Sequence, residues 1–188
     1  MTAATAILWR SAALGSAERC VIADQPGHEA IHGRAVLALH DVPASIDYVV
    51  HTAPDWTALL AVVEIAAGDA SQKIQLERSD RAWTVNGTSR PDLAACTFVD
   101  LGWSPATNTL PLRARSLQVN ESHTARAAWL RFPELDVVAS EQTYTRLAND
   151  VVRYNSSTFT AELAVTGDQI VTRYGDDLWR ADKLRTTR

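Results

Sequence analysis

Apolar and polar residues alternate along much of this chain, and a hydrophobic period of two is typical of β-strands with one buried face. From Phe159 to Val165 every second residue is apolar, and Gly167-Asp168 then leads into another apolar run over 170–174. Glycine and aspartate are residues that turns favour. The pattern therefore predicts a β-hairpin.

Other parts of the chain repeat this pattern. Residues 73–77 alternate, and turn signals at Ser79-Asp80 and Asn86-Gly87 flank a short run over 83–85. Signals for helices are few, so we expect an all-β protein with less than about a fifth of its residues in helices, against roughly one third in an average globular protein. Further strands are predicted over 56–65, which is apolar on both faces, and over 127–132 and 135–147, which Pro133 separates.

The composition is that of one soluble globular domain. Of the 188 residues, 46% are apolar and 21% are charged, and both shares are ordinary for globular proteins. We expect a single domain over residues 1–188, with a disordered tail over about 183–188. The N-terminal residues lack the basic segment of a signal peptide, and no run approaches the ~20 apolar residues of a membrane span. These features predict a soluble, cytoplasmic protein without a transmembrane segment.

The charge of the chain argues against one class of partner. The formal net charge is −4, and no basic run is present. Proteins that bind nucleic acids neutralise phosphates with clustered lysine and arginine residues. We therefore expect no nucleic-acid partner, and the sequence does not specify an oligomeric state.

A weak internal similarity is also present. Four segments of the first half match four segments of the second half in order, although the gaps between them differ. The first series is Tyr48-Val-Val, Trp56, Ile74-Gln-Leu-Glu and 83–87, and the second is Tyr144-Thr-Arg, Tyr154, Ala161-Glu-Leu-Ala and 170–175. This similarity predicts two similar β-halves that curl around one interior.

Three segments in the second half form a distinctive series. They are Asp100-Leu-Gly-Trp-Ser-Pro-Ala-Thr-Asn-Thr-Leu-Pro-Leu-Arg-Ala-Arg115, Trp129-Leu-Arg-Phe-Pro-Glu-Leu135 and Glu141-Gln-Thr-Tyr-Thr-Arg146. Together they resemble the signature of the bacterial family called "putative glycolipid-binding", and the resemblance extends from about Trp9 to Trp179.

The resemblance implies both a fold and a function. The fold is a large, strongly curved antiparallel sheet that forms an open or half barrel with an apolar groove. A curved sheet that its own side chains do not fill leaves room for an acyl chain. The resemblance therefore implies a non-enzymatic binding protein whose partner is a hydrophobic or amphiphilic small molecule, such as a glycolipid.

The first segment of the series supplies four candidate ligand contacts. Asp100, Asn108, Thr109 and Arg113 lie in a predicted loop that is rich in turn formers. Amides and hydroxyls pair with sugar hydroxyls, and arginine pairs with phosphate or carboxylate. We expect a polar mouth here that contacts a head group, above an apolar cavity inside the sheet. The alternative role is structural, with short polar side chains capping the backbone and two prolines fixing a crossover between two sheets.

Other candidates lie on the predicted strands. Gln142, Tyr144 and Arg146 share one face, because residues two apart on a strand point the same way. They form either a row of hydrogen-bond donors along the groove or a solvent-facing stripe. Aromatic side chains fill large spaces between sheets, so the aromatic residues of these regions belong either to the groove wall or to the core. The aromatic candidates are Tyr48, Trp56, Trp129 and Tyr144.

An enzymatic alternative rests on His28-Glu-Ala-Ile-His32, which matches the H-E-x-x-H signature of zinc hydrolases. That chemistry needs a helix that places both imidazoles on one face with the glutamate as general base. Here glycines stand on both sides of the motif, and a strand would separate the two histidines by roughly 13 Å at ~3.3 Å per residue. No other catalytic or nucleotide-binding motif is present, so we expect no cofactor. A third alternative is an interaction module whose groove is filled by its own side chains or by a partner.

Overall fold

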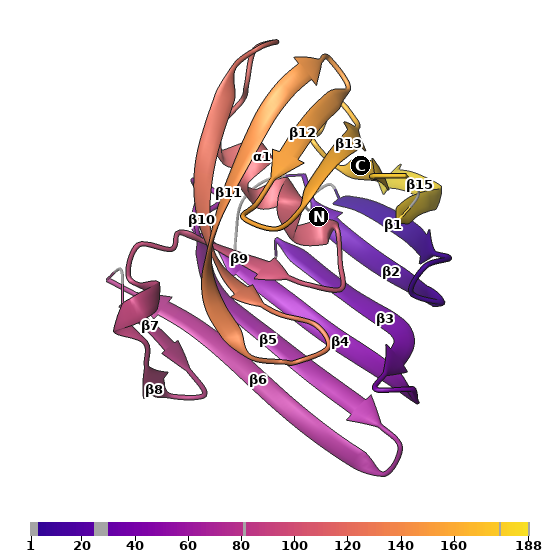
Figure 1. The fold of residues 1–188 in the computed structure, drawn as a ribbon, viewed down its shortest axis with the longest axis vertical. Helices are drawn as coiled ribbons and strands as arrows, with labels where there is room; N and C mark the ends of the chain where they lie inside the picture. Colours follow the sequence, from indigo (N-terminus) through magenta and orange to yellow (C-terminus); the bar gives the residue numbers. More distant parts are fainter. Residues whose placement is uncertain (1–3, 25–29, 81, 177, 188) are drawn as a thin grey trace.

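The structure of the protein is a computed structural model that describes residues 4–24, 30–80, 82–176 and 178–187 (Figure 1). The strands are β1 (Ala4–Ser11), β2 (Ser16–Ala23), β3 (Ile31–Leu39), β4 (Val42–Thr52), β5 (Ala58–Ala67), β6 (Ala70–Ser79), β7 (Ala82–Val85), β8 (Thr88–Ser89), β9 (Phe98–Leu101), β10 (Ser122–Leu130), β11 (Val137–Ala148), β12 (Val151–Asn155), β13 (Thr160–Val165), β14 (Val171–Tyr174) and β15 (Trp179–Thr187). The helices are two 3₁₀ turns, η1 (Pro91–Leu93) and η2 (Ala106–Asn108), and α1 (Thr109–Ala114). None of these helices is long and apolar enough to cross a membrane.

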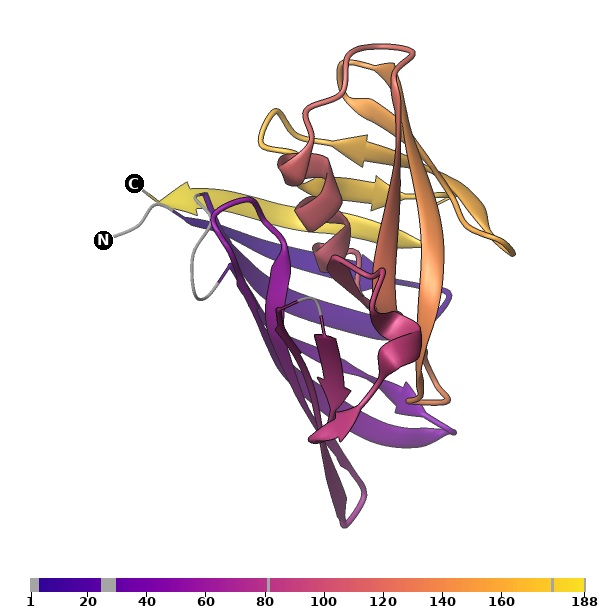
Figure 2. The ribbon, with the colours of Figure 1, turned by 90° about the vertical axis from the view of Figure 1, so that its left-hand side faces the viewer.

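All the strands of the described residues belong to one 15-stranded sheet, in the order β8-β7-β6-β5-β4-β3-β2-β1-β15-β14-β13-β12-β11-β10-β9. Neighbouring strands are antiparallel, except that β9 and β10 are parallel. The sheet is strongly curved, and its end strands β8 and β9 do not pair with each other (Figures 1 and 2). Of the described residues, 62% lie in strands and 7% in helices. The prediction of an all-β, open, curved sheet is therefore confirmed.

The first and last strands lie side by side in the middle of this order. β15 pairs with β1 from Ala4 opposite Thr187 to Arg10 opposite Arg180. The prediction of a disordered tail over 183–188 is therefore wrong as far as residue 187. The backbone of β1 provides a partner for these residues, and no local sequence signal reveals so distant a pairing. The similarity of the two halves on either side of this join stays a prediction.

The turns that the sequence predicts are present. β13 and β14 form the predicted hairpin, and Asp80 and Asn86-Gly87 have positive φ angles at the ends of β7. A cis bond joins Phe132 to Pro133 in the connection between β10 and β11. One boundary differs, because β5 begins at Ala58 and Trp56 lies in a preceding turn with a φ of 68°.

Residues 100–115, here called the inner segment, run along the inside of the curved sheet (Figure 2), and residues 103–112 are all buried. The sequence predicts a loop, whereas the structure forms η2 and α1 there. Pro111 lies in the first turn of α1, where a missing N–H breaks no helical hydrogen bond. Trp103, Leu110 and Leu112 are buried. The centre of the groove that an open sheet would leave is thus filled by the protein's own side chains.

Gly33 is required by the packing of the concave face. It lies opposite Tyr48 in the pairing of β3 with β4, and a Cβ atom added to it would stand 2.5 Å from the Tyr48 hydroxyl oxygen. We expect Gly33→Ala to displace this ring and to lower the free energy of unfolding by about 1–3 kcal/mol, the usual cost of overpacking. Urea denaturation measures this change. Gly167→Ala is the matched control, since its Cβ would have no atom within 4 Å; equal effects of the two substitutions would contradict the prediction.

Candidate binding pocket

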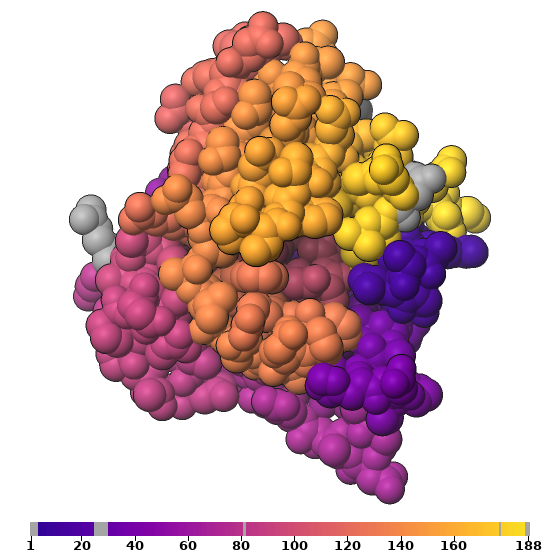
Figure 3. Space-filling view, in the orientation of Figure 1, coloured from indigo at the N-terminus to yellow at the C-terminus, as the bar shows by residue number. Residues whose placement is uncertain are grey.

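A pocket of about 290 Å³ lies between the inner segment and the C-terminal half of the sheet. In the space-filling view the surface is hollowed where the orange C-terminal half faces the inner segment (Figure 3). The lining residues come from β9, η2 and the turn before it, β10, β11, β12, β14, β15 and the connections next to them. They are Asp100, Leu101, Gly102, Ser104, Pro105, Asn108, Trp129, Ser140, Tyr154, Ser156, Ser157, Thr158, Phe159, Tyr174, Leu178 and Trp179.

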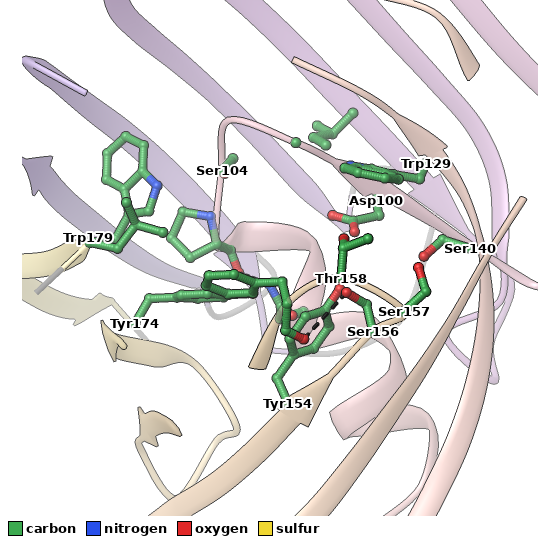
Figure 4. A pocket seen from close by; sticks show the side chains of 16 residues that line it. Asp100, Ser104, Trp129, Ser140, Tyr154, Ser156, Ser157, Thr158, Tyr174 and Trp179 are labelled. Carbon is green, nitrogen blue, oxygen red and sulfur yellow. Dashed lines mark hydrogen bonds between the residues drawn. The ribbon is translucent and has the colours of Figure 1, made fainter. Parts of the chain in front are cut away.

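The two ends of this pocket differ in chemistry (Figure 4). Asp100 faces the hydroxyl side chains of Ser140 and of residues 156–158 at one end. Tyr174 and Trp179 lie at the other end. One end therefore offers hydrogen-bonding groups, whereas the other offers aromatic surface.

The carboxyl group of Asp100 is held by two side chains. Gln142 Nε2 donates to Oδ2 at 2.5 Å, and Thr107 Oγ1 donates to Oδ1 at 3.3 Å. The Thr107 hydroxyl itself accepts the N–H of Leu101 at 3.2 Å. Burial raises the pKa of Asp100 from 3.8 to about 6, although both side-chain hydrogen bonds lower it. At neutral pH the group is therefore mainly ionised and can accept hydrogen bonds.

Tyr144 organises the residues behind Asp100. Its hydroxyl oxygen lies 3.0 Å from Asn108 Oδ1 and 3.0 Å from Gln142 Oε1. Asn108 in turn donates from Nδ2 to the carbonyl of Pro105 at 3.3 Å. Burial raises the pKa of Tyr144 well above its usual value, so the hydroxyl remains a donor. These contacts turn the amide nitrogen of Gln142 toward the carboxylate.

Three aromatic rings form a continuous wall at the other end. The Phe159 and Tyr174 rings are stacked, with centroids 6.0 Å apart and planes 19° apart. Tyr154 lies 6.3 Å from Phe159 and 6.0 Å from Tyr174, measured between centroids. Phe159 is 42% exposed, which is high for so large an apolar side chain. The wall therefore reaches from the pocket to solvent.

The structure places the ten predicted ligand contacts in three groups. Asp100, Asn108 and Trp129 line the pocket, and Gln142 and Tyr144 support its polar end. The remaining contacts, which lie away from the lining, are Tyr48, Trp56, Thr109, Arg113 and Arg146.

The two arginines of the third group bind the protein's own atoms. Arg113 donates to the carbonyls of Ala23 and Asp168, the latter at 2.8 Å. Its guanidinium carbon lies 4.8 Å from the centroid of the Trp56 ring. Arg146 donates to the carbonyl of Asn149 at 3.4 Å and to the side chain of Gln169. Arg113 thus ties the inner segment to both halves of the sheet.

A second buried carboxyl group lies beneath the pocket. Glu18, on β2, is 0% exposed and accepts a hydrogen bond from Ser104 Oγ at 2.7 Å and another from the Tyr48 hydroxyl. Burial raises its pKa from 4.5 to about 7, against the smaller lowering by these two hydrogen bonds. Ser104 lines the pocket, so Tyr48 and Glu18 hold one of its walls from behind.

The zinc alternative concerns residues that lie mostly outside the described part of the chain. His28 and Glu29 fall there. His32 lies on strand β3 rather than on a helix, and its side chain is exposed. In the described ranges no group of three His, Cys, Asp or Glu side chains is placed to hold a metal ion.

Sequence reasoning missed most of the aromatic end. Tyr154-Asn-Ser-Ser-Thr-Phe159 joins β12 to β13, and it supplies five of the lining residues. Two aromatic residues that enclose three hydroxyl residues between strands were the available signal, since rings and hydroxyls together suit amphiphilic ligands. Tyr174 and Trp179 could not be placed beside them without the register of β14 and β15.

The comparisons with known proteins agree with this architecture. No curated protein matches the chain. The crystal structure of a DUF1089 family protein from Pseudomonas aeruginosa is similar, with a TM-score of 0.76 and 26% sequence identity over 86% of this chain and 89% of that chain. The model of the family described as "Putative glycolipid-binding" matches residues 6–180. The chain therefore belongs to the family that carries this description.

Proposed function

We propose that the protein binds an amphiphilic small molecule, such as a glycolipid, in the pocket beside the inner segment, without catalysing a reaction. The observation that carries this proposal is the pairing of a hydrogen-bonding end at Asp100 with an aromatic wall in one pocket. Ligand sites usually combine apolar walls with a few placed polar groups. The description of the family supports the same ligand class.

The size of the pocket indicates how much of the ligand it holds. At about 290 Å³ it lies at the small end of the range for ligand sites, roughly 300–1,000 Å³. One ring or a short piece of chain fits, and the remainder of an amphiphile extends along the exposed edge at Phe159. Apolar surface that the ligand buries there contributes about 25 cal/mol per Å².

The composition of the lining supports binding rather than hydrolysis. Among the residues that the structure describes, Asp100 is the one carboxylic acid that lines the pocket. Hydrolysis of a glycosidic bond usually requires a pair of carboxyl groups, one as acid and one as base or nucleophile. The carboxylate of Asp100 is better suited to accept hydrogen bonds from a ligand.

Binding of an uncharged apolar probe tests this proposal. N-phenyl-1-naphthylamine should fluoresce on binding and be displaced by single-chain amphiphiles. Phe159→Ala should weaken its binding about tenfold, or ~1.4 kcal/mol, because part of the aromatic wall is lost. Val119→Ala, which removes another exposed apolar side chain, should leave binding unchanged. No saturable binding, or equal effects of the two substitutions, would exclude this pocket as the site.

A further inference from the structure

The charges around the pocket restrict its ligand beyond what the proposed function states. Asp100 lies in the lining, and no arginine, lysine or histidine is among the lining residues that the structure describes. Arg113 in the inner segment and Arg146 in β11 lie away from this lining and donate to protein carbonyls and to Gln169. A phosphate or carboxylate in the pocket would therefore meet a like charge without a compensating cation.

Two side chains outside the pocket lining orient the carboxylate of Asp100. Gln142 and Thr107 each donate to a different oxygen, and each carboxylate oxygen can accept more than one hydrogen bond. The oxygens turned toward the pocket thus require a ligand that donates. Hydroxyl groups meet this requirement, and an anionic head group does not.

Further hydroxyls surround this carboxylate. Ser140 from β11 and Ser156, Ser157 and Thr158 from the β12–β13 connection lie at the same end (Figure 4). A hydroxyl both donates and accepts, so this group can pair with several neighbouring hydroxyls of a ring. Trp129 lies beside the same end and offers a flat apolar surface.

We propose that the Asp100 end takes an uncharged ring rich in hydroxyl groups, that is, the sugar of a glycolipid. The ring enters first, and the alkyl chain leaves along Tyr154, Tyr174 and Phe159 toward solvent. Lipids with phosphate or carboxylate head groups are rejected. This inference rests on the proposed function and places the head group at Asp100 rather than at Arg113.

Two amphiphiles with the same chain test the inference. Binding of n-octyl β-D-glucoside and of n-octyl phosphate is measured by titration calorimetry below their micelle concentrations. The native protein should bind the glucoside at least tenfold more tightly. Asp100→Asn should weaken the glucoside at least tenfold, because a charged acceptor is lost, and should leave octyl phosphate unchanged or bound more tightly.

Two further variants separate local effects from unfolding. Thr158→Val replaces one exposed pocket hydroxyl by a methyl group of similar size and should weaken the glucoside about threefold. Arg113→Gln removes the positive charge of the inner segment's Arg113, which lies away from the lining, and should change neither affinity. The thermal midpoint of each variant shows whether it is folded.

The outcomes distinguish this inference from the proposed function. Equal or tighter binding of octyl phosphate, or its selective loss in Arg113→Gln, would overturn the sugar assignment. The same holds if the naphthylamine probe binds and octyl glucoside does not. If the probe and both octyl amphiphiles all fail to bind, the proposed function falls as well.

Discussion

Trp103→Ala should lower the free energy of unfolding by about 3–5 kcal/mol, the range for deleting a large buried aromatic side chain. Trp103 is 0% exposed and packs edge to face against Tyr48, with centroids 6.2 Å apart, and against Phe132, at 6.3 Å. Its removal leaves a void between the inner segment and the sheet that neither ring can fill without moving.

Urea denaturation of purified protein measures this loss. Trp129→Ala provides the matched control, because Trp129 is only partly buried at the edge of the pocket, and its loss should be smaller. A change of less than about 1 kcal/mol in Trp103→Ala would mean that the inner segment is not packed as core.

Glu18→Gln should make the protein more stable than the native form at pH 8, by up to about 3 kcal/mol. The pKa of Glu18 is about 7 in the folded state, above its ordinary value of 4.5, so the folded protein holds this proton more tightly than the unfolded chain. Stability therefore falls as pH rises from about 4.5 through 7, and each pKa unit is worth about 1.4 kcal/mol. Glutamine has no proton to lose.

The test compares native and variant stability between pH 4 and pH 8. The difference should be small at pH 4 and grow with pH. The pKa of Asp100 is also raised. Its contribution to the pH dependence of stability is the same in both proteins, so it cancels in the difference between them. Glu64→Gln, which removes a carboxyl group at an exposed position of β5, is the matched control. A pH-independent difference for Glu18→Gln would refute a buried, protonated Glu18.

Most of the sheet could be predicted from the sequence, because its signals are local. The hairpin of β13 and β14 follows from alternation and from Gly167-Asp168, and Asn86-Gly87 marks a turn in the same way. The curvature and the open form of the sheet came from the family resemblance.

The inner segment shows where local signals fail. Its prolines and short polar residues fit a surface loop, and Trp103 alone does not indicate an interior position. The burial of Glu18 could not be predicted from local sequence either, since an isolated acid on a strand is usually exposed. Its burial depends on Ser104 and Tyr48, which come from distant parts of the chain.

Only part of the candidate site could be predicted, because local sequence does not show which distant residues meet in the fold. Asp100, Asn108 and Trp129 lie in the distinctive segments and do line the pocket. Arg113 lies in the same run, but α1 turns it toward Ala23 and Asp168. The aromatic wall depends on the register of β12, β13 and β14, which sequence spacing does not provide.

The pairing of β1 with β15 has a consequence for how the chain folds during synthesis. The strands that join the two halves are separated by nearly the whole length of the chain, so this contact has the greatest loop-closure cost in the sheet. Hairpins such as that of β3 and β4 need only neighbouring residues and can form while the ribosome is still translating. The sheet becomes continuous only after β15 has emerged. Until then β1 is an open edge, exposed to the aggregation that unpaired strands promote.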